Sequence, residues 1–212
     1  TWAEIDLDAI AHNIQSIRGY VGPDTEIIAS VKANAYGHGL RPVARTALAA
    51  GADRLAVHRI QAAIALREAH ISAPILLLGH TPLSGIDLVL YHSITPTLVD
   101  WQTAKWLSDR ANKNIQVHIK IDTGMSRYGL ELDKAIEFIR YVSELPHLEI
   151  EGLFSHFATA DSPDLSFARE QWQQFQVLLN TLRDDGFKIP VPHLCNSAGL
   201  VQMPEAHLAA VR

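Results

Sequence analysis

The pattern that decides the fold stands in residues 54–78, which read RLAVHRIQAAIALREAHISAPILLL. Two short apolar runs, Arg54–Val57 and Pro74–Leu78, flank a stretch with helical periodicity, Ile60–Ala69. The runs are continuously apolar, which is typical of strands buried on both faces of a parallel sheet. A strand, a helix and a second strand of this kind form a right-handed crossover unit.

The same alternation continues along most of the chain. Further strands are predicted at Glu26–Val31, Thr95–Leu98, Gln116–Ile121, Ile150–Ser155 and Val191–Leu194, and an eighth begins at Ala209. Further helices are predicted at Leu40–Ala50, after a cap at Asp100, at Leu132–Leu145 and at Leu165–Asp185. Strands that alternate with helices predict an α/β fold, a (β/α)8 TIM-type barrel, with a doubly wound open sheet as the alternative. Such a barrel usually takes about 250 residues, so we expect an incomplete barrel, cut at strand eight, from a longer polypeptide.

The first residues do not follow this alternation. Trp2–Leu7 alternate like a half-exposed strand, and Asp8 is a candidate cap for a helix. We therefore expect residues 1–7 to form a strand that pairs outside this chain, and residues 8–212 to form the barrel.

Composition excludes several classes of protein. The 212 residues are 48% hydrophobic and 19% charged, which is ordinary for a globular domain, and the net charge of −5 argues against a nucleic-acid partner. No apolar run approaches the length of a membrane span, so we expect no membrane partner in this part. The single Cys195 excludes an internal disulfide and fits a reducing, cytoplasmic location. We predict no metal site.

A lysine stands at the end of the first predicted strand, in the run VKANAYGHG of residues 31–39. Catalytic groups of barrels lie at the carboxyl ends of strands, and a lysine in an apolar setting becomes a nucleophilic amine that reacts with aldehydes. A lysine that extends to solvent is the alternative. The nine residues resemble the pyridoxal-phosphate lysine motif of the alanine racemases, and the resemblance extends over essentially the whole chain.

The resemblance implies roles for residues near the first and third strands. Lys32 would bind pyridoxal phosphate covalently and act as acid or base on one face of the substrate α-carbon. Tyr36 would hydrogen-bond the cofactor phosphate, and Leu78 would contact the cofactor ring. His38 receives no role.

The fifth strand leads into a second motif, HIKIDTGMSRYG at residues 118–129. Asp-Thr-Gly also occurs in aspartic proteases, but a protease needs a second such carboxylate and a mostly β fold. The run resembles the racemase strand-five motif, in which Arg127 would reach the cofactor's phenolic oxygen and the substrate carboxylate. Lys120 shares the face of Asp122 and points inward. The resemblance implies a carbamylated Lys120, with an unmodified lysine paired with Asp122 as the alternative.

The last strands carry the remaining predicted site residues. The resemblance implies that His156 lies beside the cofactor's pyridine ring and supports Arg212, which would donate to the pyridine nitrogen. Asn196 and Ser197 begin a short helix whose amides, with the Ser197 hydroxyl, would bind the phosphate. Cys195 would pack as a small hydrophobe.

The resemblance as a whole implies a homodimeric, pyridoxal-phosphate-dependent alanine racemase that acts on a small amino acid by a two-base mechanism and supplies D-alanine for peptidoglycan. Lys32 serves one face only. In the family the second base is a tyrosine of the partner subunit's C-terminal β domain, which we expect to lie outside these residues. A serine racemase of the same family and a non-enzymatic barrel that binds pyridoxal phosphate are the alternatives.

Overall fold

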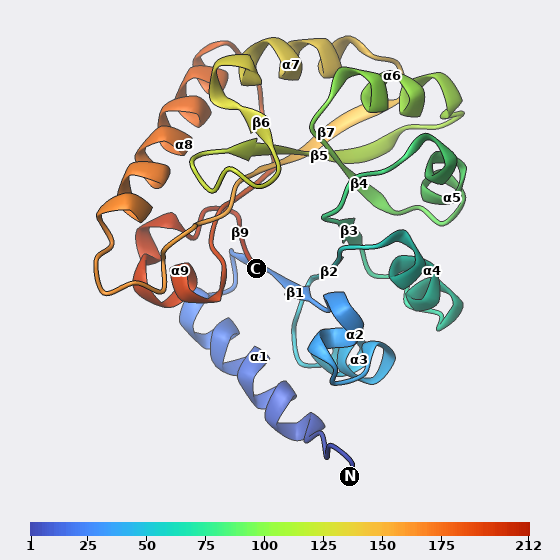
Figure 1. Ribbon diagram of the computed structural model, residues 1–212, viewed down its shortest axis with the longest axis vertical. Helices are drawn as coiled ribbons and strands as arrows, with labels where there is room; N and C mark the ends of the chain where they lie inside the picture. Colours follow the sequence, from blue (N-terminus) through green and yellow to red (C-terminus); the bar gives the residue numbers. More distant parts are fainter.

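The computed structural model describes residues 1–212 and confirms a barrel of eight parallel strands (Figure 1). Around the ring the strands are β1 (Glu26–Ser30), β2 (Arg54–Val57), β3 (Ile75–Leu77), β4 (Thr95–Leu98), β5 (Ile115–Asp122), β7 (Leu148–Phe154), β8 (Val191–His193) and β9 (Ala210–Val211). The ring is closed because β1 pairs with β2 and β9, and β4 pairs with β5. A short strand, β6 (Leu130–Glu131), adds to β5 outside the ring.

Helices surround the ring (Figure 1). They are α1 (Leu7–Val21), α2 (Lys32–Tyr36), α3 (Leu40–Ala49), α4 (Ile60–Glu68), α5 (Ile86–Tyr91), α6 (Trp101–Arg110), α7 (Leu132–Glu144), α8 (Ser166–Asp184) and α9 (Ser197–Gln202), with 3-10 turns η1 (Leu83–Gly85) and η2 (Pro204–Ala206). The Asp100 carboxylate caps α6, as predicted, by accepting from the amide of Thr103. None of these helices combines the length and apolarity needed to cross a membrane.

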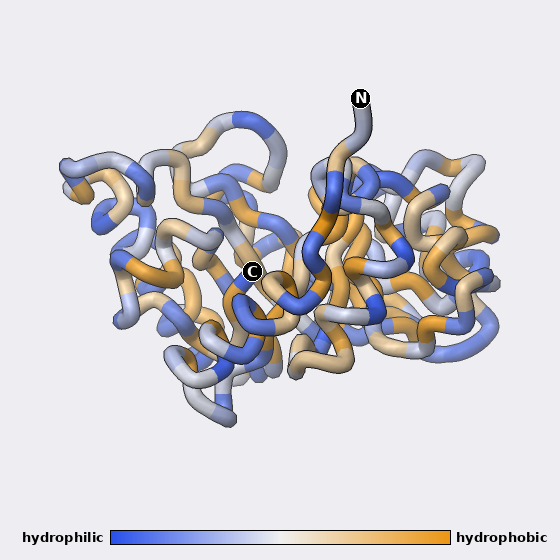
Figure 2. The backbone as a smooth tube through the Cα atoms, turned by 90° about the horizontal axis from the view of Figure 1, so that it is seen from below, coloured by the Kyte–Doolittle hydropathy of each residue, from blue (hydrophilic) through white to orange (hydrophobic).

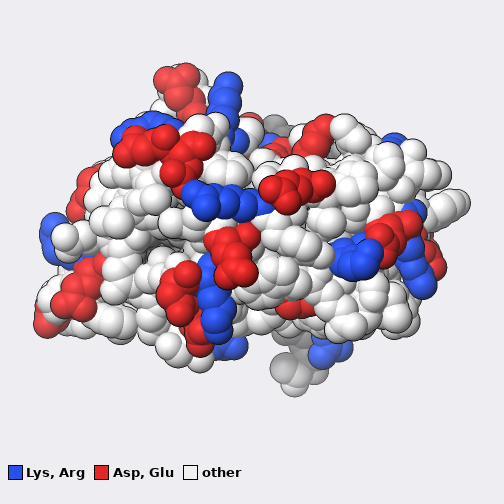
Figure 3. All heavy atoms as spheres, turned by 90° about the horizontal axis from the view of Figure 1, so that it is seen from above, with Lys and Arg blue, Asp and Glu red and all other residues white.

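Two apolar clusters hold the barrel together. The larger one lies between the strands and the helices that cover them, and Figure 2 shows apolar segments in the interior with most polar segments on the outer loops. The smaller one lies among β1, β2, β3, β8 and β9 and consists of Ile28, Ala56, Leu76, Val191 and Ala210. On the face seen in Figure 3, acidic and basic groups are interspersed, and they form no basic patch there.

The structure corrects the expected start of the first helix. Residues 1–6 have no regular secondary structure, and α1 begins at Leu7 with Asp6, not Asp8, as its N-cap. The Asp6 carboxylate accepts from two free amides of the first turn, which favours a helix start there. A strand needs a neighbour for its backbone groups, and no strand of this chain pairs with residues 1–6. Pairing with a domain outside these residues stays a prediction.

A connected set of polar side chains occupies part of the barrel interior, which the apolar strand pattern did not predict. Arg54 on β2 forms ion pairs with Glu26 on β1 and, at 2.7 Å, with Glu151 on β7. His118 on β5 lies 3.1 Å from Glu151 and 3.1 Å from the Nε2 of His193 on β8. Each charge has a partner of opposite sign, which is the condition for tolerating charges in an interior.

Candidate active site

Lys120 lies within β5 and Tyr36 lies at the end of α2, whereas the other predicted site residues follow the carboxyl ends of strands. They are Lys32 after β1, Leu78 after β3, Arg127 after β5, His156 after β7, Asn196 and Ser197 after β8, and Arg212 after β9. Because the strands of the ring are parallel, these ends share one mouth of the barrel. Leu78 is half-buried and packs against the apolar cluster inside the ring.

Lys32 opens an unusual segment of backbone. The four residues Ala33, Asn34, Ala35 and Tyr36 all have left-handed φ angles, between 51° and 56°. Such a turn costs L-residues about 1–2 kcal/mol each, so the surrounding contacts must hold it. The Asn34 side chain accepts from the Leu40 amide at 2.8 Å, and the Asn34 carbonyl accepts from the amide of residue 39 at 2.9 Å. The strained turn is therefore held by hydrogen bonds to the start of α3.

The turn brings Tyr36 to the same side as Lys32. The Lys32 Nζ lies 5.7 Å from the centre of the Tyr36 ring, and the Tyr36 hydroxyl lies 3.3 Å from the hydroxyl of Ser30 at the end of β1. Tyr36 is 58% exposed, so its hydroxyl is accessible to a ligand. The Nδ1 of His38 lies 2.8 Å from the Ala35 carbonyl and donates to it, so this imidazole stabilises the turn.

Lys120 points into the barrel and is only 9% exposed. Its Nζ donates to the Tyr128 carbonyl at 2.6 Å. The nearby Asp122 carboxylate instead accepts from the amides of Gly124 and Ser126, so the alternative of a Lys120–Asp122 ion pair is not realised. Burial, followed by the positive charge of Arg212, lowers the pKa of Lys120 to about 8.

Arg212 and His156 are in direct contact, as predicted from the pairing of their roles. The Arg212 guanidinium donates to the Nδ1 of His156 at 3.1 Å and to the Ser155 carbonyl at 3.3 Å. An acceptor Nδ1 means that His156 is neutral, with its proton on Nε2. Burial and then the charges of Arg212, Lys120, Arg127 and Lys32 lower the pKa of His156 to about 3, which agrees with this assignment.

Both side-chain hydrogen bonds of Arg212 come from Nη2, which leaves its Nε without a partner. Its Nε is buried and makes no hydrogen bond in the structure. An unsatisfied buried donor costs about 1–3 kcal/mol and is typical of a position that a ligand completes. Burial, the largest effect, lowers the pKa of Arg212 to about 10, so the side chain still carries its charge near neutral pH.

Phe154, which no sequence motif singled out, supports the two buried cations. The Lys120 Nζ and the Arg212 Cζ each lie 5.7 Å from the centre of the Phe154 ring, within the range of cation–π attraction. The ring of His193 stacks on Phe154 at 4.7 Å. The alternation of side chains along β7 could have indicated that Phe154 points inward. It places Phe154 on the same face as Gly152, and Gly152 packs against His118 inside the ring.

Both the oxygen and the nitrogen of the Asn196 side-chain amide contact backbone groups of this chain. Its Oδ1 accepts from the Gly199 amide at 2.9 Å and caps α9, and its Nδ2 lies 3.3 Å from the Phe157 carbonyl. Ser197 is the exposed first residue of α9. Direct contacts of these two residues with a phosphate stay predictions. Cys195 is buried, donates to the Ala206 carbonyl, and has a pKa that burial raises to about 12.

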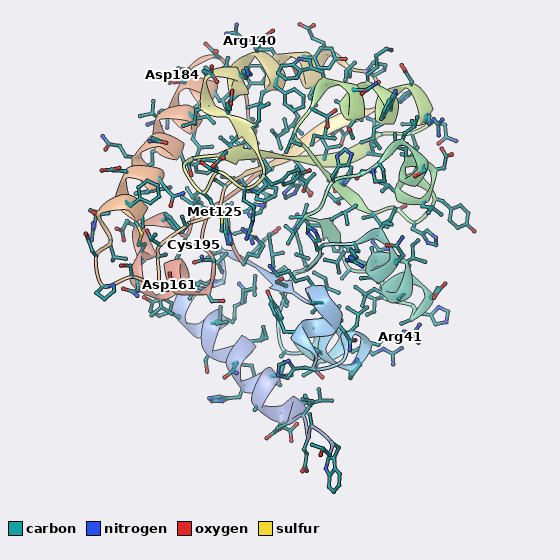
Figure 4. The ribbon with its side chains drawn as sticks, viewed as in Figure 1. Arg41, Met125, Arg140, Asp161, Asp184 and Cys195 are labelled. Atoms are coloured by element: carbon teal, nitrogen blue, oxygen red, sulfur yellow. The ribbon has the colours of Figure 1, made fainter.

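Figure 4 separates the barrel mouth from the periphery. Met125, on the loop after β5, and Cys195 lie toward the ring, whereas Arg140 and Asp184 lie on the outer helices. Arg41 projects outward from α3.

The cations at the mouth have no carboxylate partners. Lys32, Lys120, Arg127 and Arg212 take part in none of the ion pairs of the structure, yet all four influence the pKa of His156. The fold and this site define the class: a TIM-type barrel with a cationic ligand site at the carboxyl ends of its strands.

Comparison with known proteins identifies the family. The family profile described as "Alanine racemase, N-terminal domain" matches residues 5–212. Over its full length the chain is 46% identical to the alanine racemase of Desulforamulus reducens, of which it covers 58%. It is 45% identical to the alanine racemase of Clostridium perfringens, of which it covers 55%. This chain belongs to the alanine racemase family, and it spans somewhat more than half the length of these relatives.

Solved structures agree with this assignment. The alanine racemase of Clostridium difficile 630 superposes with a TM-score of 0.97 at 35% identity, covering all of this chain and 60% of that one. The alanine racemase of Bacillus anthracis with bound L-Ala-P superposes with a TM-score of 0.93 at 37% identity and is covered over 56% of its length.

Proposed function

We propose that this chain is the cofactor-binding part of an alanine racemase, an isomerase that interconverts L-alanine and D-alanine with pyridoxal phosphate. The observation that carries the proposal is the group of four cations, Lys32, Lys120, Arg127 and Arg212, that lack carboxylate partners at the barrel mouth. Cations brought together without ion-pair partners are stabilised by an anionic ligand. A phosphorylated cofactor and the carboxylate of an amino acid supply that charge.

The donors at the mouth fit the cofactor. Lys32 supplies the amine for its aldehyde, and the accessible hydroxyl of Tyr36 and the first turn of α9 supply donors for its phosphate. The unpartnered Nε of Arg212 is a buried donor near His156, as the pyridine nitrogen requires. When bound, pyridoxal phosphate supplies an electron sink that lowers the cost of removing the α-proton.

The remaining groups are assigned by their chemistry. Lys32 moves a proton at the substrate α-carbon on one face. Arg127 is exposed and unpaired at the mouth, and its planar guanidinium suits the substrate carboxylate. Leu78 lies at the top of the apolar cluster and offers a contact for the cofactor ring. Arg212 keeps its charge near neutral pH, so it would donate to the pyridine nitrogen, and that nitrogen would stay unprotonated.

Lys120 is the candidate for carbamylation. A pKa of about 8 leaves roughly a tenth of the side chain as free amine at pH 7, several hundred times more than an ordinary lysine offers. The ammonium first loses one proton, and the free amine then adds to the carbon of CO2 and releases a second, so a cation would become an anion beside Arg127 and Arg212. Incubation with ¹³C-bicarbonate should give a carbamate carbon signal by NMR that Lys120→Arg abolishes. An unchanged signal in that variant would contradict the assignment.

Lys32 can serve only one face of the α-carbon, so racemisation needs a second proton-transfer group, which we infer lies outside residues 1–212. We infer that a partner subunit supplies it, that the active form is a homodimer in the cytoplasm, and that the product D-alanine serves peptidoglycan synthesis. Mixing two inactive full-length variants, one lacking Lys32 and one lacking the external base, tests this inference. Shared sites predict partial recovery of racemisation, whereas sites within one subunit predict none.

The test of the proposal uses the full-length polypeptide that contains this chain. Borohydride reduction in the presence of pyridoxal phosphate, followed by peptide mapping, should label Lys32, and alanine should racemise. Labelling at another lysine would refute the assignment of the site. Labelling at Lys32 without racemisation of alanine or serine would identify a non-enzymatic cofactor-binding barrel, and faster turnover of serine would identify a serine racemase.

A further inference from the structure

Gln171 is a fully buried amide on α8, and none of the site roles described above involves it. Its exposed fraction is 0%, whereas Gln173 and Gln174, its neighbours on the same helix, are exposed. It lies on the inward side of α8 beside Trp172, where an apolar residue would be expected from the helical pattern. A buried amide costs free energy unless its hydrogen bonds are satisfied, so its partners indicate why it is there.

The partners of Gln171 lie on the loop that carries His156. The Gln171 Oε1 accepts from the Ala158 amide at 2.9 Å, and its Nε2 donates to the His156 carbonyl at 3.1 Å. These two backbone groups have no backbone partners. The Gln171 side chain therefore binds the loop on both sides of Phe157 and replaces the backbone hydrogen bonds that a strand or helix would supply.

The same amide also reaches the end of β5. Its Nε2 lies 3.3 Å from the Thr123 hydroxyl, which lies 2.8 Å from the Ser155 hydroxyl. Thr123 directly follows Asp122 at the start of the loop that carries Arg127. Gln171 thus ties together the ends of β5 and β7, two neighbouring strands of the ring.

The loop held in this way orients Arg212. The Arg212 guanidinium donates to the Nδ1 of His156 and to the carbonyl of Ser155, and both residues are fixed by the Gln171 network. We propose that Gln171 is a positioning residue that sets the imidazole of His156 and, through it, the direction of the Arg212 guanidinium. Its consequence for catalysis rests on the proposed function, whereas its effect on His156 does not.

Two variants of the full-length protein test this inference, with Gln174→Met as a matched control on the exposed side of α8. Gln171→Met keeps the length of the side chain and removes all its hydrogen bonds. Gln171→Glu keeps an acceptor for Ala158 and regains a donor to the His156 carbonyl only when its carboxyl is protonated. The first readout is the ¹⁵N spectrum of the His156 imidazole, assigned with His156→Gln, which reports tautomer and protonation without the cofactor.

Wild type and Gln174→Met should show neutral His156 with an acceptor Nδ1 at pH 7. Gln171→Met should show mixed tautomers and a kcat lowered by about tenfold to a hundredfold, with KM changed by less than about threefold. In Gln171→Glu the native imidazole signal should return as pH falls and the carboxyl becomes protonated.

A Gln171→Met protein that is only less stable, with wild-type imidazole signals and wild-type kcat, would overturn the inference. If Gln171→Met does not fold, the test rests on Gln171→Glu. A His156 imidazole signal that does not change as the introduced carboxyl is protonated would also overturn the inference. Altered imidazole signals in a protein whose wild type racemises nothing would uphold the inference and refute the proposed function.

Discussion

Gly152 on β7 has no room for a side chain, and Gly152→Ala is the sharpest test of the packing inside the barrel. A Cβ at this position would stand 2.3 Å from the Nδ1 and 2.4 Å from the Cε1 of His118, its partner in the β5–β7 ladder. His118 is fully buried and hydrogen-bonded to Glu151 and His193. The imidazole cannot turn away without breaking one of these bonds.

The size of the effect follows from three contributions. Overpacking a well-filled interior costs about 1–3 kcal/mol, and a buried polar group left without its partner costs about another 1–3 kcal/mol. Reduced freedom of the unfolded chain offsets about 0.4–1 kcal/mol. The expected loss in the free energy of unfolding is therefore about 1–6 kcal/mol. The central value of about 3 kcal/mol corresponds to roughly 6–12 °C in Tm for a domain of this size.

Urea unfolding followed by circular dichroism measures this loss. Gly19→Ala is the control, because Gly19 lies in α1 with nothing within 4 Å of an added Cβ. That control should gain about 0.5–1 kcal/mol, as alanine does over glycine in a helix. A Gly152→Ala protein within about 0.5 kcal/mol of the wild type would refute the packing described for His118.

The other predictions concern the mouth of the barrel. Asn34→Ala removes the acceptor of the Leu40 amide. It should lower the free energy of unfolding by about 1–2 kcal/mol and slow the borohydride labelling of Lys32. An unchanged urea midpoint together with an unchanged labelling rate would contradict this prediction. In CO2-free buffer Lys120 should contribute a rise in stability between pH 8 and pH 10.5, on the order of 3 kcal/mol, because the unfolded chain then holds a proton that folded Lys120 has lost. The raised pKa of Cys195 acts in the opposite direction, so the contribution is measured as the difference between the wild type and Lys120→Met; an identical pH dependence in both proteins would contradict it. Asn196→Ala removes the cap of α9 and should lower the free energy of unfolding, measured in urea, by about 1–2 kcal/mol. Asn196→Asp keeps a capping oxygen and should retain most of the stability. Equal losses in the two variants would argue against the cap.

Much of the fold could be predicted from local pattern. Each run of continuous apolar residues marked a strand, since both faces of a barrel strand are buried; Arg54–Val57 and Thr95–Leu98 have the predicted bounds, and the others shift by one or two residues. The placement of Lys32, His156 and Arg212 at one mouth followed from the same reading, because parallel strands end on one side.

The tertiary structure alone decided the features that depend on several strands at once. The polar set Glu26, Arg54, His118, Glu151 and His193 comes from five strands, and its contacts across the ring form only when the ring is closed. The left-handed turn after Lys32 is strained for its residue types, so no local propensity could indicate it. Sequence by itself determined where the strands lie, because periodicity and burial are local properties. Which charges meet, and which stay unpaired for a ligand, was decided by the closure of the barrel, which brings distant residues into contact.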